Sequence, residues 1–481
     1  MTIIAHHHRP YPTLPPPVPY PYASLPLAGF SPAFMPFKYN AGFGSELQSD
    51  ALGDALPPFG NNPQKCPYDL YAEQISGTAF TVPRKDNKRT WMYRIQPSVL
   101  HAPFKAVEKG ALSHGAFVAE NGFTVTPNQL RWNPLPAGAT GTQWCDGFTT
   151  MAGHGDPQGK SGLAIHMYSC DTSMGKRAMY NSDGEMLVVP QEGALKVQTE
   201  LGWLDVPPGH IAVLPRGLVF RVEVEGPSRG YVLEVFKGHF DLPDLGPIGS
   251  NGLANARDFE YPVAAYDETS DAAGVAGTYD WQLVNKFGGK MFETKREGTP
   301  FNVVAWHGNY APYRYDMAKF CCINSVTFDH PDPSIYTVLT CKGDGNGTAT
   351  ADFVIFPPRW MCMDNTFRPP WYHRNCMSEF MGMVWGKYDA KEGFRAGGAS
   401  LHSCMTPHGP DAATFNAASN ADLKPDKFDK GLAFMFETDV MLSVSQKALD
   451  AEHRDKEYFR CWEGIPRNFE KVVTTSGKRK R

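Results

Sequence analysis

Short apolar stretches separated by proline and glycine follow one another along the chain from residue 39 onward. The pattern is clearest over residues 186–236, where apolar and polar residues alternate over 195–200 and over 220–224, with the turn Pro207-Pro208-Gly209 between them. Successive side chains of a strand point to opposite faces, so each alternating run predicts a half-buried antiparallel strand. Such closely spaced turns predict an all-β sandwich or barrel rather than alternating strands and helices.

Helical patterns are short and few, and the best candidate is the charged stretch over residues 450–462. No apolar run reaches the length of about 18 residues that a membrane-spanning helix needs. The apolar stretch at the N-terminus is also too short for a secretory signal. We therefore expect a cytoplasmic protein with no membrane partner.

The length of 481 residues predicts roughly two to four packed units. Ten of the 41 prolines lie in residues 1–36, and proline resists both helix and sheet, so residues 1–38 are predicted to be a mobile arm. Histidines gather between His307 and His408, which indicates a boundary near residue 318. We predict an N-terminal β-sandwich domain over 39–318, a C-terminal catalytic domain over 319–470 and a basic tail over 471–481.

The charge of the chain is nearly balanced, with 46 Lys plus Arg against 50 Asp plus Glu and a net charge of −4. A protein that binds nucleic acid usually carries a basic excess, so nucleic acid is not expected as a partner. The ten cysteines are too sparse for a disulfide framework and are predicted to be reduced packing residues.

The segments that carry candidate chemistry contain four histidines and a glutamate, namely His330, His373, Glu379, His402 and His408. His373 and Glu379 are six residues apart, which is about 20 Å along a straight strand, so a shared metal requires a sharp bend between them. Two imidazoles and one carboxylate are the ligand set of non-haem Fe(II) oxygenases, although zinc accepts the same ligands. On spacing alone, His402 and His408 are equally good third ligands.

Five motifs spread over the chain give it a close resemblance to the homogentisate 1,2-dioxygenase family. They are YNAGFG at 39–44, WHGNY at 306–310, DFVIFPPRW at 352–360, HRNCMSEFMG at 373–382 and MTPHGPD at 405–411. The resemblance extends from residue 39 to about residue 465. It implies an N-terminal β-sandwich followed by a C-terminal jelly roll of the cupin kind, assembled as a hexamer that is a dimer of trimers.

Carried over residue by residue, the resemblance implies that His373, Glu379 and His408 bind Fe(II). It also implies that His330 is the proton acceptor, that His402 is a further active-site histidine, and that Tyr388 binds the substrate carboxylate, with His408 also beside the substrate. Residues 186–236 contain no His pair and Glu at comparable spacing, so this stretch is expected to be a metal-free sheet.

The implied reaction is the opening of the aromatic ring of homogentisate by O₂ to give 4-maleylacetoacetate, in phenylalanine and tyrosine catabolism. The alternative is a non-catalytic cupin-like protein with a binding or structural role, because a fold by itself does not fix a function. A zinc hydrolase is a second alternative, since its ligands would be the same.

Overall fold

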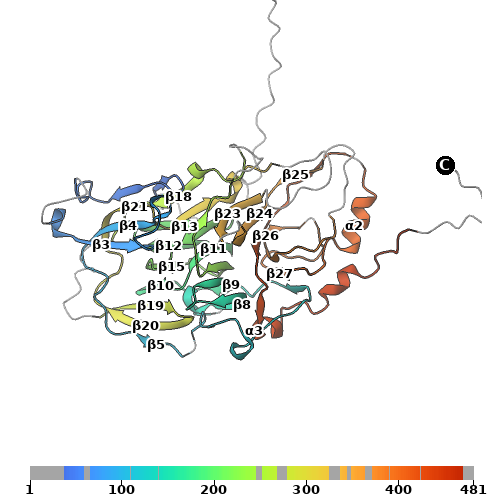
Figure 1. The fold of residues 1–481 in the computed structure, drawn as a ribbon, viewed down its shortest axis with the longest axis horizontal. Helices are drawn as coiled ribbons and strands as arrows, with labels where there is room; N and C mark the ends of the chain where they lie inside the picture. The colour runs from blue at the N-terminus through green and yellow to red at the C-terminus, as the bar shows by residue number, and fades with distance from the viewer. Residues whose placement is uncertain are drawn as a thin grey trace, which may run out of the picture. The chain divides into compact units, whose positions relative to one another are not determined.

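Strands dominate the computed structural model of the protein, as the alternating pattern predicts (Figure 1). The only α-helices among the described residues are α2 (Ala412–Ser419) and α3 (Gln446–Asp450), and neither has the length or apolar content of a membrane-crossing helix. The all-β fold class with minor helix is therefore confirmed. The structure describes residues 37–58, 65–108, 110–138, 140–244, 252–267, 279–323, 336–343, 348–362, 371–388, 390–422 and 424–469.

The largest sheet, called the central sheet here, has ten strands. In spatial order they are β1 (Tyr39–Ala41), β18 (Phe259–Pro262), β22 (Tyr313–Asp316), β14 (His210–Leu214), β11 (Glu185–Glu192), β16 (Ser228–Val235), β9 (Ser161–Cys170), β8 (Phe148–Asp156), β30 (Ser443–Ser445) and β6 (Phe123–Thr124). Every pairing in this sheet is antiparallel.

A seven-stranded outer sheet covers one face of the central sheet and completes a β-sandwich. Its strands are β13 (Gly202–Val206), β12 (Leu195–Thr199), β15 (Phe220–Glu223), β10 (Arg177–Asn181), β19 (Trp281–Phe287), β20 (Lys290–Arg296) and β5 (Lys105–Ala106). The half-buried pattern predicted for residues 220–223 is confirmed in β15, where Phe220 and Val222 are buried and Arg221 and Glu223 are partly exposed. One pairing, between β10 and β19, is parallel.

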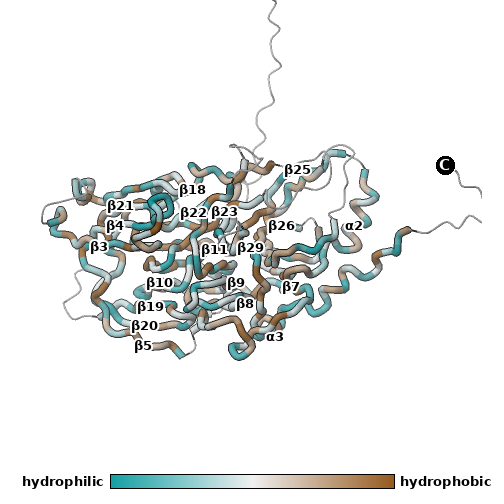
Figure 2. Tube along the Cα trace, viewed as in Figure 1, coloured by the Kyte–Doolittle hydropathy of each residue, from teal (hydrophilic) through white to brown (hydrophobic). Residues whose placement is uncertain are grey.

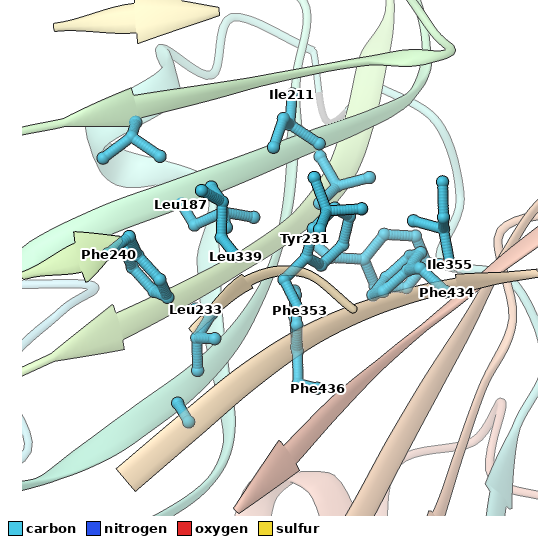
Figure 3. Close-up of a cluster of buried hydrophobic side chains, with 14 of the residues drawn as sticks. Leu187, Ile211, Tyr231, Leu233, Phe240, Leu339, Phe353, Ile355, Phe434 and Phe436 are labelled. Atoms are coloured by element: carbon cyan, nitrogen blue, oxygen red, sulfur yellow. The ribbon is translucent and has the colours of Figure 1, made fainter. Parts of the chain in front are cut away.

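A second seven-stranded sheet, called the C-terminal sheet here, covers the other face of the central sheet. Its strands are β17 (Phe240–Asp241), β23 (Thr337–Lys342), β24 (Ala349–Phe356), β29 (Gly431–Thr438), β26 (Ser378–Gly386), β27 (Ala399–His402) and β7 (Leu130–Trp132). Figure 3 shows apolar side chains from the two sheets facing one another, with Leu187 and Leu233 on one side and Phe353 and Phe436 on the other.

The central sheet therefore has no solvent-facing side along its middle strands. In β11, Met186 and Val188 enter the core shared with the outer sheet, while Leu187 and Val189 enter the core shared with the C-terminal sheet. The prediction of half-buried strands throughout residues 186–236 is wrong for this strand, because a strand buried on both faces is apolar without alternation. Apolar stretches interrupted by hydrophilic turns can be followed along the chain in Figure 2.

Two smaller sheets complete the described strands. A four-stranded sheet has the order β2 (Leu47–Asp50), β21 (Val303–Gly308), β4 (Arg89–Arg94) and β3 (Tyr71–Ser76), and β25 (Arg359–Cys362) pairs with β28 (Asp426–Phe428).

Two of the three large sheets contain strands from both sides of the boundary predicted near residue 318. The C-terminal sheet takes β7 and β17 from the earlier part of the chain, and the central sheet takes β30 from the later part. The described residues from Phe37 onward belong to one compact unit. The division at residue 318 stays a prediction.

The structure tests the two predictions about the ends of the chain only in part. Residues 1–36 of the predicted arm and residues 471–481 of the predicted tail lie outside the described residues, whereas Phe37 stacks on Trp203 with ring centroids 5.6 Å apart.

The prediction of a helix over 450–462 is mostly wrong. Helix α3 ends at Asp450, and a 3₁₀ helix covers only Tyr458–Trp462.

Candidate metal centre

Strand β26 carries Glu379 near its start, and the strand register fixes what surrounds this carboxylate. Glu379 pairs directly with His402 of β27 on one side and with Glu437 of β29 on the other. Directly opposed residues of antiparallel strands share a face of the sheet. The three side chains therefore project from the same face of the C-terminal sheet.

His373 and His408 are brought together by an isolated antiparallel bridge outside the sheets. The amide of His373 donates to the carbonyl of His408 at 2.9 Å, and the amide of His408 donates to the carbonyl of His373 at 3.0 Å. Their ring centroids are 4.2 Å apart. The two imidazoles thus lie side by side although 35 positions separate them in the sequence.

The bend that the six-residue spacing requires occurs between His373 and the start of β26. Asn375 makes it, because its Oδ1 accepts a hydrogen bond from the amide of Met377 at 3.0 Å and turns the chain into the strand. As a result Nε2 of His373 lies 3.6 Å from Oε1 of Glu379, and Nε2 of His408 lies 2.9 Å from Oε2.

Both ring orientations are fixed by the other imidazole nitrogen. Nδ1 of His408 lies 2.9 Å from the carbonyl oxygen of Thr406, and Nδ1 of His373 lies 3.2 Å from that of Trp371. A carbonyl can only accept, so each Nδ1 carries a hydrogen and each Nε2 faces Glu379, where it donates a hydrogen bond when the ring is protonated and can bind a metal when it is not. The three ligand atoms lie within 4.8 Å of one another, and this donor set fits a divalent metal ion.

Residues that sequence reasoning did not identify hold the carboxylate in place. The side-chain NH₂ of Asn375 donates to Oε1 of Glu379 at 2.9 Å and to Oε1 of Glu437 at 2.6 Å, so one amide serves two carboxylates. Asn375 belongs to the HRNCMSEFMG motif, but Glu437 lies 58 residues beyond Glu379. Only the pairing of β26 with β29 identifies this partner.

His402 lies beside the cluster. Its ring stacks on that of His408 with centroids 4.1 Å apart and an angle of 7°. Its Nε2 lies 3.0 Å from the hydroxyl of Tyr458 and 3.3 Å from the ammonium of Lys391, so it accepts from these donors. Within the described part of the chain, Nδ1 of His402 is buried without a hydrogen-bond partner.

Burial and neighbouring charges shift the pKa values of these groups and so decide which of them are ionised at neutral pH. Burial opposes ionisation of Glu379, but hydrogen bonds from His373 and His408 outweigh it and hold the pKa of this carboxyl well below its usual value. Burial, followed by the charge of Lys391, lowers the pKa of His402 well below 6.5. Burial also lowers the pKa of Lys391 to about 8. Glu379 is thus a carboxylate and His402 a neutral imidazole at neutral pH.

A glycine lets the segment of His408 approach that of His373. A Cβ added to Gly409 would lie 2.5 Å from Cδ1 and 2.9 Å from Cα of Tyr372. On the other side, the indole nitrogen of Trp462 donates to the carbonyl of Pro410 at 3.1 Å. Asp411 then caps α2 by accepting from the amide of Thr414.

The remaining predicted residues are not part of the described cluster. Tyr388 is partly buried just after β26, and its ring contacts Phe356 and Phe394 with centroids 6.3 and 5.8 Å away. His330 lies outside the described residues.

Comparison with known proteins gives matches over nearly the whole chain. The family model "Homogentisate 1,2-dioxygenase N-terminal" matches residues 38–317, and "Homogentisate 1,2-dioxygenase C-terminal" matches residues 318–469. Relatives named homogentisate 1,2-dioxygenase include that of Dictyostelium discoideum, 53% identical over 90% of this chain and 98% of its own length. Those of Caenorhabditis elegans and Drosophila melanogaster are each 52% identical, over 91% and 90% of this chain and 98% of their own lengths.

Solved structures give only a distant likeness. A cupin 2 conserved barrel domain protein from Leptotrichia buccalis aligns with a TM-score of 0.26 and 9% identity, covering 62% of this chain and 92% of that one. A score this low adds nothing to the assignment.

Proposed function

Because this chain belongs to the homogentisate 1,2-dioxygenase family, we propose that it opens the aromatic ring of homogentisate with O₂ to give 4-maleylacetoacetate. The observation that carries the proposal is the convergence of His373, Glu379 and His408, with both imidazoles presenting Nε2 to one carboxylate. The family membership, rather than the ligand set alone, separates this reading from that of a protein with only a binding or structural role.

We propose that these three residues hold Fe(II). Two imidazoles and one carboxylate on one side of a metal leave positions open for substrate and O₂. Fe(II) bound there would supply a Lewis acid and the redox chemistry that O₂ requires. His373 is the most exposed of the three, with 28% of its side chain accessible against 7% for Glu379 and 6% for His408, so substrate is proposed to enter on the side of His373.

The chain's own residues are proposed to position the substrate and move its protons. His330 is proposed to accept the proton of a ring hydroxyl, since an imidazole titrates near neutral pH. Tyr388 is proposed to donate its hydroxyl hydrogen to the acetate carboxylate of the substrate. His402 is proposed to stay off the metal and to offer Nδ1–H to the substrate, because its Nε2 is already occupied by Tyr458 and Lys391.

The assembly is proposed on the sequence resemblance, and the location and the domain bounds are proposed on the pattern of the sequence itself. We propose a cytoplasmic hexamer built as a dimer of trimers, with the sandwich domain over 39–318 and the catalytic domain over 319–470. Sedimentation of the purified protein tests the hexamer, which predicts six times the chain mass of 53.2 kDa.

The function is tested by oxygen uptake with homogentisate, using protein loaded with Fe(II) and matched protein loaded with Zn²⁺. We expect uptake only with iron. His373→Ala should lose most bound iron and activity, whereas His330→Ala should keep its iron and lose about 10² to 10⁴ in rate. No uptake by the iron-loaded protein would favour the binding protein, and hydrolytic activity of the zinc form would favour a zinc enzyme.

A further inference from the structure

A second group of two histidines and a glutamate lies buried in the sandwich, away from the cluster on the C-terminal sheet. It consists of His114, His166 and Glu234, whose ligand atoms all lie within 4.8 Å of one another. The side chains of His114, His166 and Glu234 are 1%, 0% and 0% exposed. The expectation of a metal-free sheet rested on spacing within residues 186–236, and the structure supplies the two histidines from elsewhere.

The strand register explains how the group forms. His166 on β9 pairs with Val232 on β16, and Glu234 is two positions further along that strand, so the two side chains are diagonal neighbours on one face. His114 comes from the loop before β6. Its amide and that of Gly115 both donate to the carbonyl of Gly289, at 3.0 and 3.2 Å, and fix the loop beside the sheet.

The geometry repeats that of the candidate metal centre. Nε2 of His166 lies 3.1 Å and Nε2 of His114 lies 3.9 Å from Oε2 of Glu234, compared with 2.9 and 3.6 Å between the histidines and Glu379. An asparagine supports the carboxylate in both places, because the side-chain NH₂ of Asn181 donates to Oε1 of Glu234 at 2.7 Å.

The ring of His114 is oriented as a metal ligand would be. Its Nδ1 lies 2.9 Å from the carbonyl oxygen of Gly115, so Nδ1 carries the hydrogen and Nε2 keeps a lone pair. This Nε2 is buried and has no hydrogen-bond partner among the described residues. It faces a carboxylate oxygen at a distance too long for a hydrogen bond, and two electron-rich atoms in a buried place call for a cation between them.

Lys286 is the competing cation, and it pairs with one oxygen of Glu234 while Nε2 of His166 is hydrogen-bonded to the other. The ammonium lies 2.7 Å from Oε1 of Glu234 and 3.0 Å from Asp183, whereas the imidazoles face Oε2. The Lys286 charge should make this site bind a metal less tightly than the centre at Glu379.

We propose that His114, His166 and Glu234 bind a second divalent transition-metal ion with a structural role. Imidazole and carboxylate ligands suit Zn²⁺, Co²⁺ and Fe²⁺. A cavity of about 750 Å³ is lined by His114 and by Thr150, whose hydroxyl lies 3.0 Å from Nδ1 of His166, so open space reaches the edge of the group. The deeply buried ligands offer no room for a substrate, so the ion is expected to stabilise the sandwich.

The test counts metal in full-length protein equilibrated with Co²⁺ under anaerobic conditions and then freed of excess ion. We expect two equivalents in the wild type, one in His373→Ala, one in His114→Ala and none in the double variant. His154→Ala is the matched control, since its side chain is exposed and bonds the carbonyl of Met441, and this variant should keep two. In the His373→Ala protein, Co²⁺ should raise Tm by about 5 °C, and His114→Ala should remove this rise.

A single equivalent in the wild type, lost in His373→Ala, would overturn the proposal and leave Lys286 as the cation that balances the charge of Glu234. A second equivalent that persists in His114→Ala would also overturn it, since the ion would then lie elsewhere. Neither readout uses homogentisate or O₂. Failure of this proposal is therefore distinct from failure of the proposed dioxygenase activity.

Discussion

Replacing Gly409 by alanine should disturb the candidate metal centre through the backbone alone. The added Cβ would lie 2.9 Å from Cα of Tyr372, and this atom cannot be rotated away. Relief to an ordinary contact requires a backbone shift of about half an ångström, and the contact of Trp462 with Pro410 resists it from the other side. The shift would move Gly409, the neighbour of His408. The carbonyl and the amide of His408 both form hydrogen bonds with His373.

The magnitude follows from what such a displacement costs. Overpacking of this kind typically costs about 1–3 kcal/mol, and a misplacement near 1 Å at a reacting centre costs about 10²-fold in rate. We therefore expect Gly409→Ala to lower kcat/KM about ten- to a hundredfold and to weaken metal binding, with little change in secondary structure. Iron content by elemental analysis and initial rates of oxygen uptake, measured on the same preparation, give both quantities.

The matched control is Gly226→Ala. A Cβ at Gly226 would have no heavy atom within 4 Å, and its backbone conformation is open to any residue, so this variant should behave like the wild type. If Gly409→Ala keeps full iron and full activity, the close approach of Tyr372 does not position His408 and the reasoning is refuted.

Two further predictions concern residues around the centre. Tyr388→Phe should keep its iron and lower kcat/KM for homogentisate about ten- to a hundredfold, because the substrate carboxylate loses one hydrogen bond. An equal loss of kcat/KM with an analogue that lacks the carboxylate would show that Tyr388 is only a packing residue. Lys391 has a folded pKa of about 8 against a reference value of 10.5, so between these pH values the unfolded state binds the extra proton. Raising the pH through this window should therefore stabilise the wild type relative to Lys391→Met by up to about 3 kcal/mol in unfolding free energy, and parallel stability curves for the two proteins would contradict the assignment.

The fold class was predictable because turn residues and alternation are local signals. The turn at Pro207–Gly209 is present, with the amide of His210 donating to the carbonyl of Pro207. The double burial of β11 was not predictable, since an apolar run does not show whether one or two sheets cover it. Helix α2 was missed for a similar reason, because it has no buried residue and so no apolar stripe, and its start is set by the cap at Asp411.

The candidate site was predictable only as a set of residue types. Histidines and a glutamate on turn-rich segments indicated a metal, and the resemblance selected His408 over His402. The sequence could not show that Glu437 shares Asn375 with Glu379, or that His166 lies diagonally from Glu234. Both relations are created by the register of strands far apart in the sequence, and register depends on how the whole sheet packs.

The short strands β7 and β17 at the two edges of the C-terminal sheet bear on how the protein can be made. Both belong to the earlier part of the chain, so during synthesis they leave the ribosome before the strands they will cover. A fragment beginning at residue 318 would lack both and would present unpaired amides and carbonyls along β23 and β27. Such open edges recruit strands from other molecules, so this fragment should aggregate unless residues 37–317 are supplied with it.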